Sequence, residues 1–275
     1  MNLRRRQVTV ALSTSALTAP IARAQPTEDA ALLAAIAGPQ RSDANRARDA
    51  ARHPYETLRF FGLRPVHAVV ELAPGGGWFT EILAPYLRER GKLYAAHYAK
   101  DDGSEERRRS RAAFEAKLAR DPERYDRVVV GTLPRGAAFT DIAPPGGADR
   151  VLTFRNLHNW LEDGTLDDRL RAFHSVLKPG GVLGVEDHRA APGTPLDRQK
   201  SSGYLAEDLV IERVRGAGFV LDARSEINAN PRDGKDHPHG VWSLPPTLRG
   251  GDTDRARFLA IGESDRFTHR YVKPS

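Results

Sequence analysis

Apolar residues alternate along the chain between short runs typical of buried strands and longer stretches with helical spacing. The short runs are rich in Val and Leu, as expected for strands buried on both faces. Between them apolar residues recur every three or four positions, which predicts amphipathic helices. We expect strands near residues 67–72, 92–98, 127–133, 149–154, 182–188, 220–223 and 265–273. We expect helices near residues 28–37, 42–62, 79–87, 104–120, 166–177 and 204–215.

A glycine-rich turn at residues 74–77 separates the first strand from the helix that follows. Such a turn lets backbone N–H groups and a helix N-terminus approach a ligand, because no side chain stands in the way. Glu71 ends the strand and can accept hydrogen bonds from ribose hydroxyls or from an ammonium group. The Gly-x-Gly-x-x-Gly spacing of dinucleotide-binding loops is not met, since Thr80 stands three positions after Gly77.

Residues 71–80, Glu-Leu-Ala-Pro-Gly-Gly-Gly-Trp-Phe-Thr, resemble the cofactor loop of class I S-adenosylmethionine (SAM) methyltransferases. The family pattern is an acidic residue followed by glycines two, four and six positions later. Glu71, Gly75 and Gly77 fit this pattern, and Ala73 takes the place of the first glycine. The resemblance implies a SAM site with Glu71 on the ribose or methionine end. Its residues would be Glu71, Ala73, Pro74, Gly75, Gly76, Gly77 and Thr80.

A second stretch of the chain strengthens this resemblance. A helix, then Leu-Lys-Pro-Gly-Gly at residues 177–181, then an apolar strand are similar to the region before the fifth strand of the family. The resemblance covers residues 58–273 and is closest to exported predicted methyltransferases of bacteria. It implies an α/β fold: a three-layer, doubly wound, mostly parallel seven-stranded sheet of the Rossmann-like class I methyltransferase type, with an antiparallel seventh strand.

Polar side chains follow the fourth strand, in the segment Arg-Asn-Leu-His-Asn-Trp. In a doubly wound sheet, ligands bind beyond the carboxyl ends of the strands where the strand order reverses. The ends of the first and fourth strands would flank that crevice, so Asn156, His158 and Asn159 become candidate catalytic residues and Arg155 a candidate cofactor residue. His158 could remove or orient an acceptor proton, because the unperturbed pKa of histidine lies near neutrality. The alternative is a packed polar turn that caps the next helix.

The end of the second strand departs from the family pattern. An acidic residue at that position commonly binds both ribose hydroxyls, but this chain has His97 and Tyr98 there, and Asp101 and Asp102 come slightly late. We assign His97 to the cofactor site. The sequence leaves the ribose-binding residue open.

Two segments outside the core pattern could cover the site. The resemblance implies that the helix before the domain lies over the cofactor, where Arg48 and His53 would face the substrate; solvated helix charges are the simpler interpretation. Residues 228–262 form a long Pro/Gly-rich connection, and connections of this length are commonly functional or mobile. Such a connection could cover the active site.

The amino-acid composition excludes several kinds of functional site. Of the 275 residues 40% are hydrophobic and 28% charged, which fits a soluble globular protein. The absence of cysteine excludes disulfides, thiolate metal sites and a cysteine nucleophile. Glu186, Asp187 and His188 end the fifth strand and could bind a metal, but no spacing requires it. We therefore predict no metal site.

The N-terminus predicts export. Three arginines at residues 4–6, an apolar run over residues 8–20 and Ala-Arg-Ala at residues 22–24 have the layout of a cleaved signal peptide. The paired arginines resemble a twin-arginine signal, but residues 7–9 fit that pattern loosely and export through the general route stays open. An amphipathic or disordered leader is the alternative to a signal peptide. The apolar run is too short to span a bilayer. We expect a signal peptide (1–24), a helical extension (25–57), a methyltransferase domain (58–275) and a periplasmic or secreted protein without stable membrane insertion.

Cleavage of the predicted leader would lower the net positive charge of the chain. Residues 1–24 carry four of the 42 basic residues and no acidic one, so 38 basic face 36 acidic residues and the net charge falls from +6 to +2. This balance gives no basis for nucleic-acid binding.

The sequence predicts methyl transfer from SAM to an O or N nucleophile of a small-molecule or envelope acceptor. Two alternatives stay open. One is a noncatalytic exported protein that binds a small ligand on the same fold. The other is a nucleotide-dependent oxidoreductase, which the glycine spacing disfavours.

Overall fold

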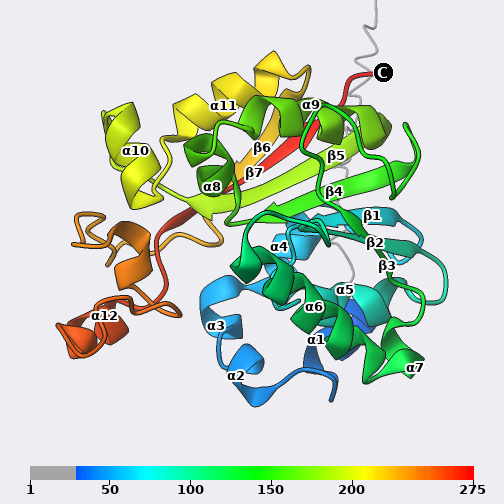
Figure 1. Cartoon of the computed structure of the whole chain (residues 1–275), viewed down its shortest axis with the longest axis horizontal. Helices are drawn as coiled ribbons and strands as arrows, with labels where there is room; N and C mark the ends of the chain where they lie inside the picture. Colours follow the sequence, from blue (N-terminus) through cyan, green and yellow to red (C-terminus); the bar gives the residue numbers. More distant parts are fainter. Residues whose placement is uncertain (1–28) are drawn as a thin grey trace, which may run out of the picture.

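The computed structural model describes residues 29–275 (Figure 1). The predicted signal peptide lies outside these residues. No helix within them is long and apolar enough to cross a membrane. One sheet contains seven strands: β1 (Ala68–Leu72), β2 (Lys92–His97), β3 (Val129–Thr132), β4 (Ala148–Phe154), β5 (Leu177–His188), β6 (Val220–Ser225) and β7 (Arg266–Val272).

The strand order is β3-β2-β1-β4-β5-β7-β6. All neighbouring strands are parallel except β7, which runs antiparallel to both β5 and β6. The order reverses between β1 and β4, and Glu71 of β1 is in register with Leu152 of β4. This topology confirms the predicted fold class, including the antiparallel seventh strand. It also places the ends of β1 and β4 at the crevice where ligands bind in such sheets.

Helices cover both faces of the sheet (Figure 1). On one face lie α8 (Leu157–Glu162), α9 (Leu166–Val176) and α11 (Glu207–Gly216). The other face packs against α1 (Ala30–Ala37), α4 (Pro54–Phe60), α5 (Thr80–Leu87), α6 (Glu105–Ala119) and α7 (Pro122–Tyr125). The remaining helices are α2 (Asp43–Arg46), α3 (Asp49–Arg52), α10 (Leu196–Ser202), the 3-10 turn η1 (Gly240–Ser243) and α12 (Arg255–Ile261).

The pleat of β1 explains why its apolar run is nearly continuous. Val69 packs into the cluster with α4 and α5, whereas Val70 and Leu72 pack into the cluster with α9 and α11. Successive side chains of a strand point to opposite faces, so a strand between two helical layers needs apolar residues on both. Each fully buried side chain of this size contributes about 1.5–3 kcal/mol.

The N-terminal extension docks beside the glycine turn. Ser42 caps α2 by accepting a hydrogen bond from the backbone N–H of Asn45. The Nε1–H of Trp78 donates to the backbone oxygen of Asn45 at 3.1 Å, and the Asn45 amide donates to Glu81 at 2.9 Å. These bonds hold α2 and α3 over the start of α5. In Figure 1 α2, α3 and the segment carrying α12 lie beyond the ends of β4 and β5.

Short helices are where the structure departs from the sequence expectation. The segment after β4 forms α8 instead of a turn, α10 forms in an expected loop, and η1 and α12 interrupt the long connection at residues 228–262. The start of α8 is fixed by Asp187 of β5, whose carboxylate accepts the Leu157 N–H at 2.7 Å. Asn156 stands at the N-cap and is a residue type favoured there, but its side chain donates to the Leu72 oxygen and makes no cap hydrogen bond.

Replacing Gly184 with Ala should destabilise the fold by about 1–3 kcal/mol, the usual cost of overpacking a core. Gly184 lies within β5, and a Cβ there would stand 2.6 Å from the ring of fully buried Phe61. Urea unfolding measures the effect. Gly216→Ala, at the end of α11, is the control: its Cβ meets nothing within 4 Å, and its stability should be unchanged or slightly higher. Equal stability of the two variants would contradict the packing argument.

Candidate active site

A cavity of about 380 Å³ opens at the carboxyl ends of β1 and β4. Most residues that the sequence assigned to the site line it: Glu71, Ala73, Pro74, Gly75, Gly76, Arg155, Asn156, His158 and Asn159. Three assigned residues, Gly77, Thr80 and His97, do not line it. The topology therefore brings the two separate candidate segments to one cavity.

His97 supports the glycine turn from behind. Its Nδ1 accepts a hydrogen bond from the backbone N–H of Tyr98 at 2.8 Å, so its Nε2 carries the proton and donates to the Gly75 oxygen at 3.2 Å. The ring is fully buried, and burial lowers its pKa to about 4. Both nitrogens of this neutral imidazole are occupied by protein groups.

Glu71 presents a buried carboxyl group to the cavity. The Thr80 hydroxyl donates to its Oε2 at 2.6 Å, which explains why Thr80 lies behind Glu71 and not on the cavity wall. Burial raises the pKa of Glu71 to about 7, although the Thr80 bond favours the charged form. The other carboxyl oxygen is left for a hydrogen-bond donor on a ligand.

Two residues at the mouth of the crevice have positive φ values, which are strained for residues other than glycine. Ala73 follows β1 with φ 44°, and Arg155 follows β4 with φ 61°. The departure of Ala73 from the family glycine therefore falls at a left-handed position where glycine would be unstrained. Asn156 ties the two strand ends together by donating to the Leu72 oxygen at 3.1 Å. Strain of this kind concentrates at functional sites.

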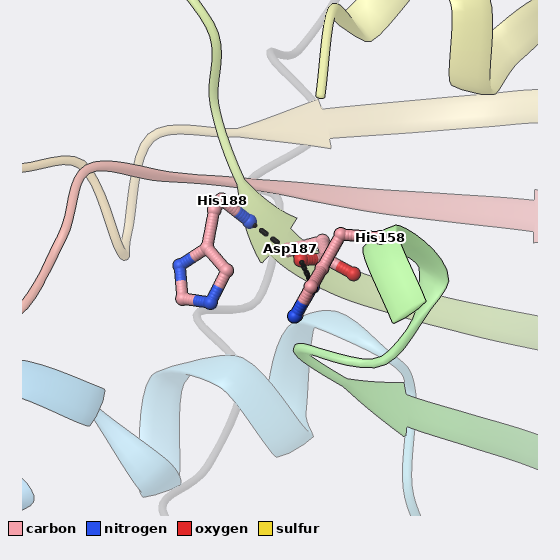
Figure 2. Close-up of side chains that lie close together, drawn as sticks. All are labelled: His158, Asp187 and His188. Carbon is pink, nitrogen blue, oxygen red and sulfur yellow. Dashed lines mark hydrogen bonds and ion pairs between the residues drawn. The ribbon is translucent and has the colours of Figure 1, made fainter. Parts of the chain in front are cut away.

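Asp187 of β5 holds His158 of α8 in one orientation (Figure 2). The Asp187 carboxylate is fully buried, and its Oδ1 accepts hydrogen bonds from His158 Nδ1 at 2.9 Å and from the His188 N–H at 2.8 Å. Its Oδ2 accepts the Leu157 N–H. Because a carboxylate only accepts, the proton of neutral His158 sits on Nδ1 and its Nε2 keeps a free lone pair. The pair has the arrangement of a general base with an orienting carboxylate.

His188 is a second imidazole on the same wall. Its ring centroid lies 5.0 Å from that of His158, and its Nδ1 is bonded to the Ser264 hydroxyl at 2.6 Å. Burial, together with His158, lowers the pKa of His188 well below its usual value, so the ring is neutral. Figure 2 shows both rings on the same side of the β5 end.

The ligand atoms of His158, Asp187 and His188 lie within 4.8 Å of one another, close enough to hold a metal ion. The Asp187 carboxylate already accepts three N–H groups, so the two imidazole Nε2 atoms are the ligand atoms of the cluster without a hydrogen bond among the described residues. Catalytic zinc sites have three protein ligands. The cluster therefore fits proton transfer better than metal binding.

The long connection between β6 and β7 contributes part of the cavity wall. Val241, Trp242, Pro245, Pro246 and Thr247 line it, and the Trp242 ring lies 6.0 Å from the His158 ring. From the N-terminal extension Arg48 also lines the cavity, whereas His53 does not.

Sequence reasoning missed several lining residues, namely Asn45, Arg52, Trp78, Phe79, Phe154 and His188, and it missed the pairing of Asp187 with His158. A signal for the histidine pair was present: Asp187 and His188 end the strand that neighbours β4, so the topology alone predicts their proximity to His158. No such signal exists for Asn45 and Arg52, whose docking depends on contacts with distant residues.

A second cavity, of about 410 Å³, lies beyond β2 and β3. Tyr98, Asp102 and Arg107 are among its lining residues. Asp102, which comes slightly late for the family's ribose-binding acid, accepts the Ser104 N–H at 2.9 Å and an Arg135 bond at 3.4 Å. An acidic side chain is thus present at this end of the sheet.

No protein-family model and no curated protein matches the sequence. Among solved structures, a SAM-dependent methyltransferase from Aquifex aeolicus is similar at 17% identity and a TM-score of 0.53, covering 82% of this chain and 93% of that one. The glycopeptide N-methyltransferase MtfA complexed with sinefungin is similar at 17% identity and 0.51, covering 82% and 94%. The [4+2]-cyclase SpnF is similar at 19% identity and 0.60, covering 88% and 92%.

The chain has the class I methyltransferase fold. At these identities the likeness establishes the fold and no more. SpnF is named for a cyclisation, so sharing this fold does not by itself fix the reaction. The side chains that face the cavity determine which reaction this fold can carry out.

Proposed function

We propose that this protein is a SAM-dependent methyltransferase that moves a methyl group to an O or N nucleophile of a small-molecule or envelope acceptor. The proposal rests on one observation: residues of the two candidate segments line the same cavity. Glu71 and the glycine turn face it from β1, and His158, oriented by Asp187, faces it from the β4 and β5 side. This is the switch point of the sheet, where ligands bind in such folds.

The residues present fit the cofactor. Glu71 keeps a carboxyl oxygen free for the methionine ammonium or a ribose hydroxyl of SAM. At Gly75 and Gly76 even a Cβ would meet nothing within 4 Å, so a ligand can approach the backbone closely. We assign the adenosine end to the second cavity, where Tyr98 and Asp102 stand beyond β2.

SAM supplies a methyl group made electrophilic by its sulfonium. The protein then contributes mainly alignment of the acceptor, worth up to about 7–11 kcal/mol. His158 Nε2 takes the proton of the attacking hydroxyl or amine, and the Asp187 carboxylate stabilises the imidazolium that results. Asn156 and Asn159 line the same wall and orient the acceptor.

We also propose that residues 1–24 direct export, that residues 25–57 form the extension and residues 58–275 the catalytic domain, and that the chain belongs with exported bacterial methyltransferases. SAM is made in the cytoplasm, so the cofactor would have to travel with the folded protein. A twin-arginine route permits this, because it moves folded proteins.

Calorimetry tests the proposed function directly. We expect the purified protein to bind SAM and its demethylated product, S-adenosylhomocysteine (SAH), with micromolar affinity, and not to bind NADH. NADH is the matched control because it shares the adenosine moiety but not the methionine. Well-folded protein that bound neither SAM nor SAH would contradict the proposal, and tight NADH binding would favour the oxidoreductase.

A further inference from the structure

One wall of the active-site cavity holds more positive than negative charge. Four buried or half-buried arginines from three separate segments meet there with two buried glutamates: Arg48, Arg52, Arg155, Arg266, Glu186 and Glu263. Arg266 pairs with Glu186 at 3.0 Å and with Glu263 at 2.9 Å. Arg48 and Arg155 also pair with Glu263, at 2.7 and 3.5 Å. The two carboxylates are thus shared among three of the arginines.

Two further acids near this wall, Asp187 and Glu71, form no ion pair with Arg52 among the described residues. The Asp187 carboxylate accepts three N–H groups of its own surroundings and forms no ion pair with an arginine among the described residues. Glu71 has a pKa raised by burial to about 7, so about half of it is neutral at pH 7. Within the cluster itself, four guanidinium groups face two carboxylates, Glu186 and Glu263, and Arg52 pairs with neither of them.

Arg52 has no carboxylate partner among the residues that the structure describes. The residue is 3% exposed and lines the cavity, yet its Nε and Nη1 make no hydrogen bond. It lies over the Trp78 ring at 4.0 Å and the Phe79 ring at 4.8 Å. Burial lowers its pKa, which is the electrostatic sign of an uncompensated charge.

Neighbouring arginines also keep free donors. Arg48 Nη2 and Arg155 Nε are buried without a hydrogen-bond partner within residues 29–275. Both residues line the cavity beside Arg52. Buried charges in proteins are normally paired, so three arginines with unused N–H groups around one cavity indicate an anion that arrives with a ligand.

We propose that Arg52, with Arg48 and Arg155, binds the anionic group of the methyl acceptor, a carboxylate or a phosphate. The planar guanidinium matches both groups by paired N–H bonds. The inference rests on the proposed function and names its acceptor class. Arg52 and Arg155 lie close enough to His188 to contribute to its lowered pKa, after burial and His158. An anion held there leaves the rest of the acceptor beside His158.

The carboxylate of SAM itself is the other source of the same chemistry, because Trp78 and Phe79 follow the glycine turn. The two sources predict different effects of losing Arg52 on the affinity for ligands that carry a carboxylate and for ligands that lack one. If the cofactor supplies the anion, loss of Arg52 weakens SAH but not 5′-methylthioadenosine, which has no carboxylate. If the acceptor supplies it, SAH affinity changes little.

The test uses Arg52→Met, which keeps the apolar stem over Trp78 and removes the charge, and Arg52→Lys, which keeps the charge. Arg109→Met, on the exposed face of α6, is the matched control. Phosphate and 4-hydroxybenzoate are titrated against tryptophan fluorescence, since Trp78 lies directly beneath Arg52 and Trp242 lines the same cavity. Neutral 4-hydroxybenzyl alcohol reports binding without an anion.

We expect saturable binding of both anions to the wild type, at least tenfold weaker binding to Arg52→Met, and intermediate binding to Arg52→Lys. Arg109→Met should match the wild type. The thermal midpoint of Arg52→Met should be no lower than that of the wild type, because an unpaired buried charge is removed. A normal midpoint separates loss of binding from loss of folding.

Three other results are possible, and each leads to a different conclusion. Normal SAH binding with no Arg52-dependent anion binding would overturn this inference and leave the proposed function standing. An Arg52→Met variant that loses SAH but keeps 5′-methylthioadenosine would assign the anion to the cofactor and overturn the acceptor class. Arg52-dependent anion binding by protein that binds no SAH would support the anion site and overturn its role in methyl transfer.

Discussion

At pH 8 the Glu71→Gln variant should be more stable than the wild type by about 3 kcal/mol and should bind SAH about 10- to 100-fold more weakly. The stability gain follows from burial, which raises the pKa of Glu71 from 4.5 to about 7, at about 1.4 kcal/mol for each pKa unit. The affinity loss follows from replacing a charged acceptor by a neutral one in a buried site. A buried carboxyl group that lowers the stability of the fold and faces a cavity is expected to have a role in ligand binding.

The stability difference should depend on pH with a definite sign. The folded state keeps the Glu71 proton between about pH 4.5 and about pH 7, where the unfolded chain has released it. Folding therefore takes up a proton in this window, and the Glu71 contribution to the free energy of unfolding falls as the pH rises through it. Below about pH 4.5 the variant and the wild type should have equal stability.

Urea unfolding at pH 4, 6 and 8 measures this difference, and calorimetry with SAH measures the affinity. His67 and His97 have pKa values lowered by burial to about 4 and impose an opposite pH dependence, but they are present in both proteins and cancel in the comparison. Thr80→Ser, which keeps the hydroxyl that donates to Glu71, is the control and should behave like the wild type. A stability difference that is the same at pH 4 and pH 8 would show that desolvation of Glu71 is not its cause.

The strands were predictable because their signal is local. A strand covered on both faces needs a nearly continuous apolar run, and β1 and β5 formed where such runs predicted them. The alternation of Phe267, His269 and Tyr271 with polar residues likewise marked β7. The topology then followed from the family resemblance and placed residue 71 opposite residues 155–159. That is why Glu71 and His158 were assigned to one site from sequences nearly ninety residues apart.

The missed features depend on distant partners. Helix α8 begins where Asp187, 30 residues away, accepts the Leu157 N–H, and the local N-cap residue Asn156 makes no side-chain cap hydrogen bond. Arg52 was read as one of several charges on a solvated helix. It becomes a cavity residue only because Trp78 and Phe79 stack against it, and because the preceding helix, α2, docks through Asn45. Burial of a charge is a tertiary property that periodicity does not report.

His158→Gln should lower methyl transfer by about 10²–10⁴-fold, the usual contribution of a general base, and should leave SAH affinity unchanged. The glutamine retains much of the shape but cannot take a proton. Asp187→Asn should also lower the rate, because an amide N–H in place of a carboxylate oxygen opposes one of the three N–H donors that it faces. The rate is measured as SAH formed with any hydroxy acid that passes the anion titration.

The neighbouring imidazole provides the control for this prediction. His188 lines the same cavity, but a serine hydroxyl, and not a carboxylate, stands behind its Nδ1. Serine cannot stabilise an imidazolium as an anion does, so His188→Gln should cost much less than His158→Gln in rate. Equal losses in both variants would assign the effect to cavity shape. A loss in His158→Gln that appears in SAH affinity instead of turnover would make His158 a binding residue, and the buried Asp187 would then serve the fold of α8 and not proton transfer.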